Sequence, residues 1–229
     1  MNKHIPPIFL TPKTSMLAGG FYLLTFISIP TLSLYAPLRE ANFLQNVGST
    51  NGIVLGTVLE IVMALACIAT AVVFYPVLKK QNQVLALGFV ASRILEASLI
   101  FMGVGILLTA LSLQKEGLSS SASLLVHTLV NLYDRIFLIS QSFLPVVNGF
   151  LLGTLLFQSR LVPRWLPIIG ILGAFLLLLG DGLVIFGTIG QHDPMTALFA
   201  VPIAFWEFSL GIYLLSSGIY RYSKRTTTT

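Results

Sequence analysis

The chain of 229 residues contains 55% hydrophobic residues, only 9% charged residues and a mean hydropathy of +0.90. Soluble domains carry about 25% charged residues, so this composition excludes a water-soluble globule and indicates helices that face lipid. The net charge of +5 does not indicate nucleic-acid binding, because the basic residues flank apolar segments and form no patch interleaved with aromatic side chains.

Six apolar segments follow one another along the chain. Each is longer than the roughly 18 residues that a membrane-spanning helix needs. They predict an all-α polytopic membrane bundle of about six transmembrane helices, built as a single domain over residues 1–229. In chain order, we expect helices over about 16–34, 52–78, 84–113, 124–157, 166–189 and 196–220.

Basic residues in the connections predict the orientation of these helices. One side of the membrane receives nine of the 13 basic residues: Lys3, Lys13, Lys79, Lys80, Arg160, Arg164, Arg221, Lys224 and Arg225. The other side receives only Arg39 and Lys115. Because the more basic side of such proteins is cytoplasmic, both termini are expected in the cytoplasm.

Acidic residues inside the apolar segments are the most informative feature. Five of the eight acids lie there: Glu60, Glu96, Asp134, Asp181 and Glu207. A charge at the bilayer centre costs about 2.5–3.5 kcal/mol, so these acids require partners, protons or water. At about 1.5 Å per residue, all but Asp134 come to similar depths. We expect these four to line one cavity, with at least one protonated at neutral pH. Alternatively, each acid pairs separately and only holds helices together.

Two further patterns concern these acids. Arg93 precedes Glu96 by three residues, so the two share a helix face, and we expect Arg93 to pair with Glu96 or with an acid on a neighbouring helix. The long fourth segment has polar residues at seven-residue spacing, which keeps them on one face: His127, Asp134, Gln141 and Asn148. Asp134 is expected near the outer interface, and Pro145 is expected to kink this helix.

These patterns define one candidate ligand-binding set: Glu60, Arg93, Glu96, Asp134, Asp181, Trp206 and Glu207. Trp206 enters as an aromatic wall beside Glu207. We expect no cofactor and no metal, because the three histidines are scattered along the chain. No nucleophile motif is visible, so the catalytic residues stay unknown.

Three stretches carry a family resemblance: SRILEA at residues 92–97, GTLLFQSRLVPRWLPIIG at 153–170 and PIAFWEFSLG at 202–211. Together they resemble the bacterial membrane proteins grouped as domain of unknown function 4386. On this matching, the motif positions are Arg93, Glu96, Ser159, Pro163, Arg164, Trp206 and Glu207. The resemblance implies a six-helix, multi-pass protein of the bacterial inner membrane, and it implies no activity.

Three functions remain open on the sequence. The leading hypothesis is binding or transport of a small cationic or lipophilic ligand in an acidic pocket inside the membrane. The second is an intramembrane enzyme that uses a buried carboxylic acid on a lipid or isoprenoid-like substrate, so whether the chain is an enzyme stays open. The third is a structural or accessory subunit. The expected partners are membrane lipids and the small ligand, and a homodimer would supply the size that a 229-residue transporter lacks.

Overall fold

Helices make up every regular element in the part of the chain that the computed structural model describes, residues 10–40, 43, 50–116 and 120–226. Within these residues, five segments are long and apolar enough to cross a membrane: Thr50–Leu78, Gln83–Gln114, Ser123–Ser159, Trp165–Ile185 and Pro194–Tyr220. The prediction of an all-α polytopic membrane bundle is confirmed.

The spanning segments correspond to labelled helices as follows. Helix α3 is Thr50–Leu78, α4 is Gln83–Glu116, α7 is Trp165–Ile185 and α8 is Pro194–Thr226. The remaining span consists of α5 (Ser120–Phe137), the π-helical turn η4 (Leu138–Phe143) and α6 (Leu144–Ser159).

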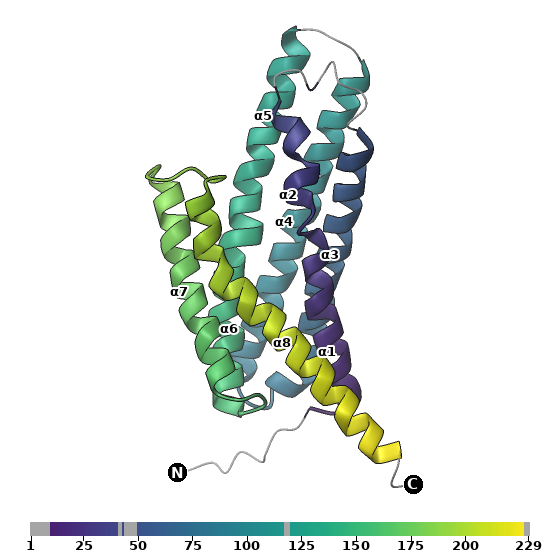
Figure 1. Cartoon of the computed structure of the whole chain (residues 1–229), viewed down its shortest axis with the longest axis vertical. Helices are drawn as coiled ribbons and strands as arrows, with labels where there is room; N and C mark the ends of the chain where they lie inside the picture. The colour runs from purple at the N-terminus through teal and green to yellow at the C-terminus, as the bar shows by residue number, and fades with distance from the viewer. Residues whose placement is uncertain (1–9, 41–42, 44–49, 117–119, 227–229) are drawn as a thin grey trace.

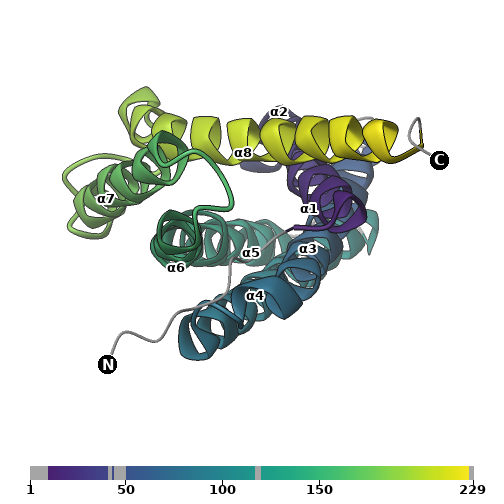
Figure 2. The same ribbon diagram turned by 90° about the horizontal axis from the view of Figure 1, so that it is seen from below.

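The helices run up and down the long axis of the molecule, except α8, which crosses it obliquely (Figure 1). The α3–α4 and α6–α7 connections lie at the same end as the start of α1 (Pro12–Thr25) and the end of α8 (Figure 1). Seen from that end, α8 lies across one face of the bundle and α4 lies on the opposite face, with α3, α5 and α6 between them (Figure 2). The bundle therefore has an interior that several helices can reach with polar side chains.

The first apolar segment differs from the expectation of one helix over 16–34. It consists of α1, a 3₁₀ turn η1 (Phe26–Ser28), the single helical turn α2 (Thr31–Leu34) and a second 3₁₀ turn η2 (Ala36–Arg39). Pro30 has no N–H with which to continue the α-helical hydrogen bonds. The Ile29 N–H donates to the Phe26 carbonyl, three residues back, as in a 3₁₀ turn. The hydroxyls of Thr25, Ser28 and Thr31 also donate to the carbonyls three residues before them, which supports the break.

Glycines bring the helices close together within one chain. Gly170 and Gly173 of α7 lie against Trp206 and the Ile203 backbone of α8. Two pairs of glycines four residues apart, at 52/56 and 149/153, act in the same way: Gly56 lies against the Tyr35 ring, Gly149 against Ala174 and Ile203, and Gly153 against Ile171. These patterns serve contacts within the monomer, so a homodimer needs another surface.

Two adjacent glycines of α1 give a matched test of this packing. A Cβ on Gly19 would lie 2.5 Å from the Leu215 nitrogen and 2.6 Å from the Gly211 carbonyl oxygen, both backbone atoms of α8, whereas a Cβ on Gly20 meets nothing within 4 Å. We expect Gly19→Ala to lower the free energy of unfolding by roughly 1–3 kcal/mol, because α8 must move away. Gly20→Ala is expected to be neutral or slightly stabilising, since alanine favours helix. Thermal unfolding in detergent checks both, and equal stability of the two variants would contradict this packing.

Candidate functional site

Arg93 and Glu96 form an ion pair inside the bundle, as the sequence predicts. The Arg93 Nη1 donates to Glu96 Oε2 at 2.8 Å, and the two side chains are 3% and 6% exposed. Three residues apart on α4, they share one face of that helix. The guanidinium also lies over the rings of Tyr22 and Phe89, with 5.3 Å and 6.0 Å to the ring centroids. The positive charge is therefore neutralised and covered on two sides.

Glu96 accepts hydrogen bonds from side chains on two further helices. The Asn148 Nδ2 on α6 donates to Glu96 Oε2 at 2.7 Å, and the Cys67 thiol on α3 donates to Oε1 at 3.7 Å. Three helices thus converge on one carboxylate. This arrangement fixes both oxygens of Glu96 and the register of α3, α4 and α6 around it.

A cavity of about 170 Å³ lies beside this ion pair, between the broken first segment and helices α3, α4, α6 and α8. Its polar lining comes from Thr25, Ser28, Cys67, Arg93, Glu96, Gln141 and Glu207. Its apolar lining comes from Phe26, Ile29, Met63 and Pro145. Phe26 packs edge-on against Phe208 of α8, with ring centroids 5.3 Å apart, and so joins η1 to α8 at the cavity.

Glu207 brings a second carboxylate to the cavity. Its Oε1 atom is buried without a hydrogen-bond partner in the described part of the chain. Glu207 also forms none of the ion pairs found among the described residues, although its charge interacts with those of Arg93 and Glu96. Since a buried acceptor without a donor is costly, this oxygen marks the place where water or a ligand would bind.

The π-helical turn η4 directs two neighbouring side chains to different helices. Pro145 lacks the N–H that would bond to the Gln141 carbonyl, and the Leu144 N–H instead bonds to the Ile139 carbonyl five residues back. On this wide turn, Gln141 donates to Glu60 of α3 at 3.2 Å, and Ser142 donates to Asp181 of α7. The expected kink at Pro145 takes the form of this turn.

The four acids predicted at one depth do not share one cavity. Glu96 and Glu207 line it, whereas Glu60 and Asp181 are absent from its lining. Glu60 accepts from the Tyr133 hydroxyl at 2.6 Å and from Gln141, and Asp181 accepts from Ser142. The expectation of a common cavity is wrong for these two, because depth along a helix does not determine the direction of a side chain around its axis.

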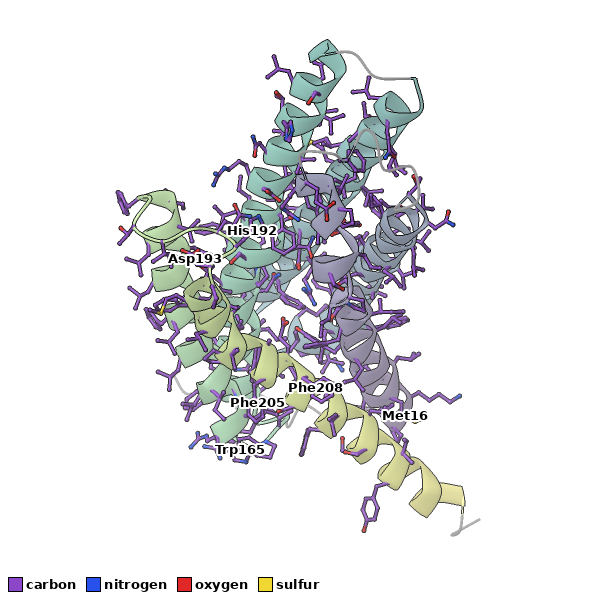
Figure 3. All side chains as sticks on the ribbon, turned by 45° about the horizontal axis from the view of Figure 1, so that its top comes forward. Met16, Trp165, His192, Asp193, Phe205 and Phe208 are labelled. Atoms are coloured by element: carbon purple, nitrogen blue, oxygen red, sulfur yellow. The ribbon has the colours of Figure 1, made fainter. Side chains whose placement is uncertain are left out.

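Asp134 lies in a separate cluster beside the loop between α7 and α8. It pairs with Arg39, and the His192 Nε2 lies 3.1 Å from its second oxygen. His192 reaches toward α5 from the loop between α7 and α8 (Figure 3). The Gln191 Nε2 donates to the Asp134 carbonyl oxygen at 2.6 Å, so the cluster holds this loop against α5. Asp134 is therefore placed to fix the loop and not to meet a cavity ligand.

Trp206 also differs from its predicted place. Its side chain is fully buried against Gly170 of α7 and does not line the cavity. The aromatic surface at the cavity comes from Phe26, the first residue of η1. Phe26 could not be singled out from the sequence, because its neighbours form a long apolar run.

Several lining residues were missed by sequence reasoning, and each had only a weak signal. Thr25 and Ser28 precede Pro30 in a pattern that favours local side-chain hydrogen bonds over a continuous helix. Cys67 follows Glu60 by seven residues, so both face the bundle interior from α3. Gln141 precedes Pro145 by four residues, which is the spacing at which proline removes a helical hydrogen bond.

The helical fold, with five segments long and apolar enough to cross a membrane in the described part of the chain, defines a multi-pass α-helical membrane protein. The family model described as "Domain of unknown function (DUF4386)" matches residues 17–218, nearly the whole chain, so the chain belongs to this family. Neither the curated proteins nor the solved structures contain a match to the chain.

Proposed function

We propose that this protein binds, and carries across the bacterial inner membrane, a small organic cation held in the cavity beside Arg93 and Glu96. The observation that carries the proposal is the buried Glu207 Oε1, which has no hydrogen-bond partner in the described residues although it lies at a cavity. An ammonium group would supply both the missing donor and the missing positive charge.

Charge at the cavity favours a cation over an anion. The lining contains two carboxylates, Glu96 and Glu207, and one guanidinium, Arg93. Because Arg93 and Glu96 pair with each other at 2.8 Å, their charges cancel, and Glu207 is the lining carboxylate whose ionised form a bound cation would stabilise. A cationic ligand completes the neutralisation, whereas an anionic ligand would add a second uncompensated negative charge in a medium of low dielectric constant.

Size and shape limit the ligand further. A dry cavity of about 150 Å³ accommodates a benzene-sized molecule, so the cavity of about 170 Å³ fits a cation with a short apolar part. Phe26, Ile29 and Met63 offer apolar contacts to that part.

The broken first segment supports transport as well as binding. Secondary transporters place their sites beside discontinuous helices, whose irregular backbone lines the cavity. Here Thr25, Phe26, Ser28 and Ile29, all at the break, line the cavity. A short 3₁₀ turn between two helical pieces also gives a place where the chain can bend without breaking a long helix.

The two alternative functions fit the geometry less well. Cys67 supplies a nucleophilic atom type in the cavity lining, but its thiol donates to Glu96, and Glu96 already neutralises Arg93. An enzyme would need a free base at that position. A purely structural role leaves the unpartnered oxygen of Glu207 without explanation.

Isothermal titration of the purified protein tests the proposal with two molecules of similar size, n-butylammonium and n-butanol. We expect the ammonium ion to bind with a stoichiometry of one per chain and the neutral alcohol not to bind measurably. Equal binding of the two compounds, or binding of neither, would contradict a cation site.

Orientation in the membrane is a separate part of the proposal. The 79–82 and 160–164 connections lie at the end of the bundle where α1 starts and α8 ends, so one end collects most of the basic positions (Figure 1). We propose that this end is cytoplasmic. His192→Cys in a Cys67→Ala background should react with an impermeant maleimide in intact spheroplasts, whereas Lys80→Cys should react only after permeabilisation. The reverse pattern would contradict this orientation.

A further inference from the structure

Glu60 is a second buried acid next to the cavity, and the proposed cation site does not use it. Its side chain is fully buried, with 0% of the residue exposed. Its Oε1 accepts two hydrogen bonds, from the Tyr133 hydroxyl at 2.6 Å and from the Gln141 Nε2 at 3.2 Å. Its Oε2 has no partner among the described residues.

No positive charge compensates Glu60 in the described part of the chain. The ion pairs there join Arg39 and His192 to Asp134, and Arg93 to Glu96. An ionised Glu60 would therefore be an isolated charge inside a membrane-spanning segment, which is costly. A proton on Oε2 removes the charge and leaves Oε1 as the carbonyl oxygen that accepts from Tyr133 and Gln141.

None of the groups that contact Glu60 carries a positive charge that could neutralise the carboxylate in place of this proton. Tyr133 of α5 and Tyr35 before η2 supply hydroxyls, with their rings packed edge-on at 5.6 Å between centroids. The turn η4 supplies the uncharged Gln141. On α4, Arg93 and Glu96 bind each other, and neither bonds to Glu60.

Gln141 connects this acid to the cavity. Its side chain lines the cavity and also donates to Glu60, so an occupant that moves Gln141 alters a hydrogen bond of Glu60. Gln141 lies on the π-helical turn, where the backbone departs from the regular α-helix. Such turns are frequent at functional sites.

We propose that Glu60 is a proton-binding site, coupled through Gln141 to occupancy of the cavity by a cation. The existence of the proton site is independent of the proposed function, and only the coupling rests on it. In this arrangement, the Gln141 side chain links cation binding beside Glu207 to proton binding at Glu60. Linkage of this kind allows a proton gradient to drive movement of the cation.

Infrared difference spectroscopy tests the proton site without any ligand. The carbonyl stretch of protonated carboxylic acids should appear in the full-length wild-type protein at neutral pH, and the component that belongs to Glu60 should be lost in Glu60→Gln. The matched variant Asp181→Asn should retain the Glu60 component, because Asp181 bonds to Ser142 and not to Tyr133 or Gln141, the donors to Glu60. Tyr133→Phe should shift the band to higher frequency, because the carbonyl loses a donor. A spectrum that is unchanged in Glu60→Gln would overturn the proposal.

The coupling is tested by adding n-butylammonium to the same samples. We expect the Glu60 band to shift in the wild-type protein and to stay unchanged in Gln141→Leu. If n-butylammonium binds to the wild-type protein and leaves the Glu60 band unchanged, the coupling is wrong. If n-butylammonium does not bind at all, the coupling and the proposed function both fail, while loss of the band in Glu60→Gln still establishes the proton site.

Discussion

Arg93→Leu is expected to lower the free energy of unfolding by about 3–5 kcal/mol, because it leaves the Glu96 carboxylate buried without its charge partner. The ion pair is 2.8 Å long and nearly inaccessible to solvent. Loss of the guanidinium also removes its contacts with the Tyr22 and Phe89 rings. Thermal or denaturant unfolding in detergent micelles measures the effect.

Two further variants separate charge from packing. Arg135→Leu is the matched control, because Arg135 also lies in a spanning segment but is exposed and bonds only weakly to Gln191, at 3.4 Å. It should change stability by less than about 1 kcal/mol. The double variant Arg93→Leu/Glu96→Leu should be more stable than Arg93→Leu alone, since it removes the orphaned charge. An Arg93→Leu protein as stable as Arg135→Leu would contradict the buried ion pair.

Glu207→Gln is expected to weaken binding of n-butylammonium by at least tenfold. A hydrogen bond to a charged group contributes about 1.5–3 kcal/mol, and each 1.4 kcal/mol changes a dissociation constant about tenfold. Glutamine keeps the size of the side chain, so the variant removes the charge without opening the cavity. Asp181→Asn is the matched control, because Asp181 is also an acid inside a spanning helix but does not line the cavity, and the affinity of this variant should equal that of the wild type.

The helical fold follows from the sequence because long apolar runs have few alternatives in a membrane. Backbone N–H and C=O groups must bond within the segment, which makes each run a helix. The first run is the exception. Its mean hydropathy matches that of a spanning helix, but Pro30 and the hydroxyls of Thr25 and Ser28 act locally and break it. A window average cannot detect such local hydrogen bonds.

Only the part of the site that lies on a single helix could be predicted from the sequence. Arg93 and Glu96 lie on the same helix, so their spacing alone brings them together. Glu60 and Glu207 lie on different helices, and their relation depends on helix rotation and on the π-helical turn that carries Gln141. Trp206 was misplaced for the same reason, because the contact with Gly170 depends on how α7 and α8 cross.

The central claim is that Glu207 supplies the negative charge of a cation-binding cavity. The most direct test is titration of n-butylammonium, side by side, into the wild-type protein, Glu207→Gln and Asp181→Asn. The structure predicts equal affinity for wild type and Asp181→Asn and at least tenfold weaker binding to Glu207→Gln. Unchanged affinity in a folded Glu207→Gln protein would contradict the claim.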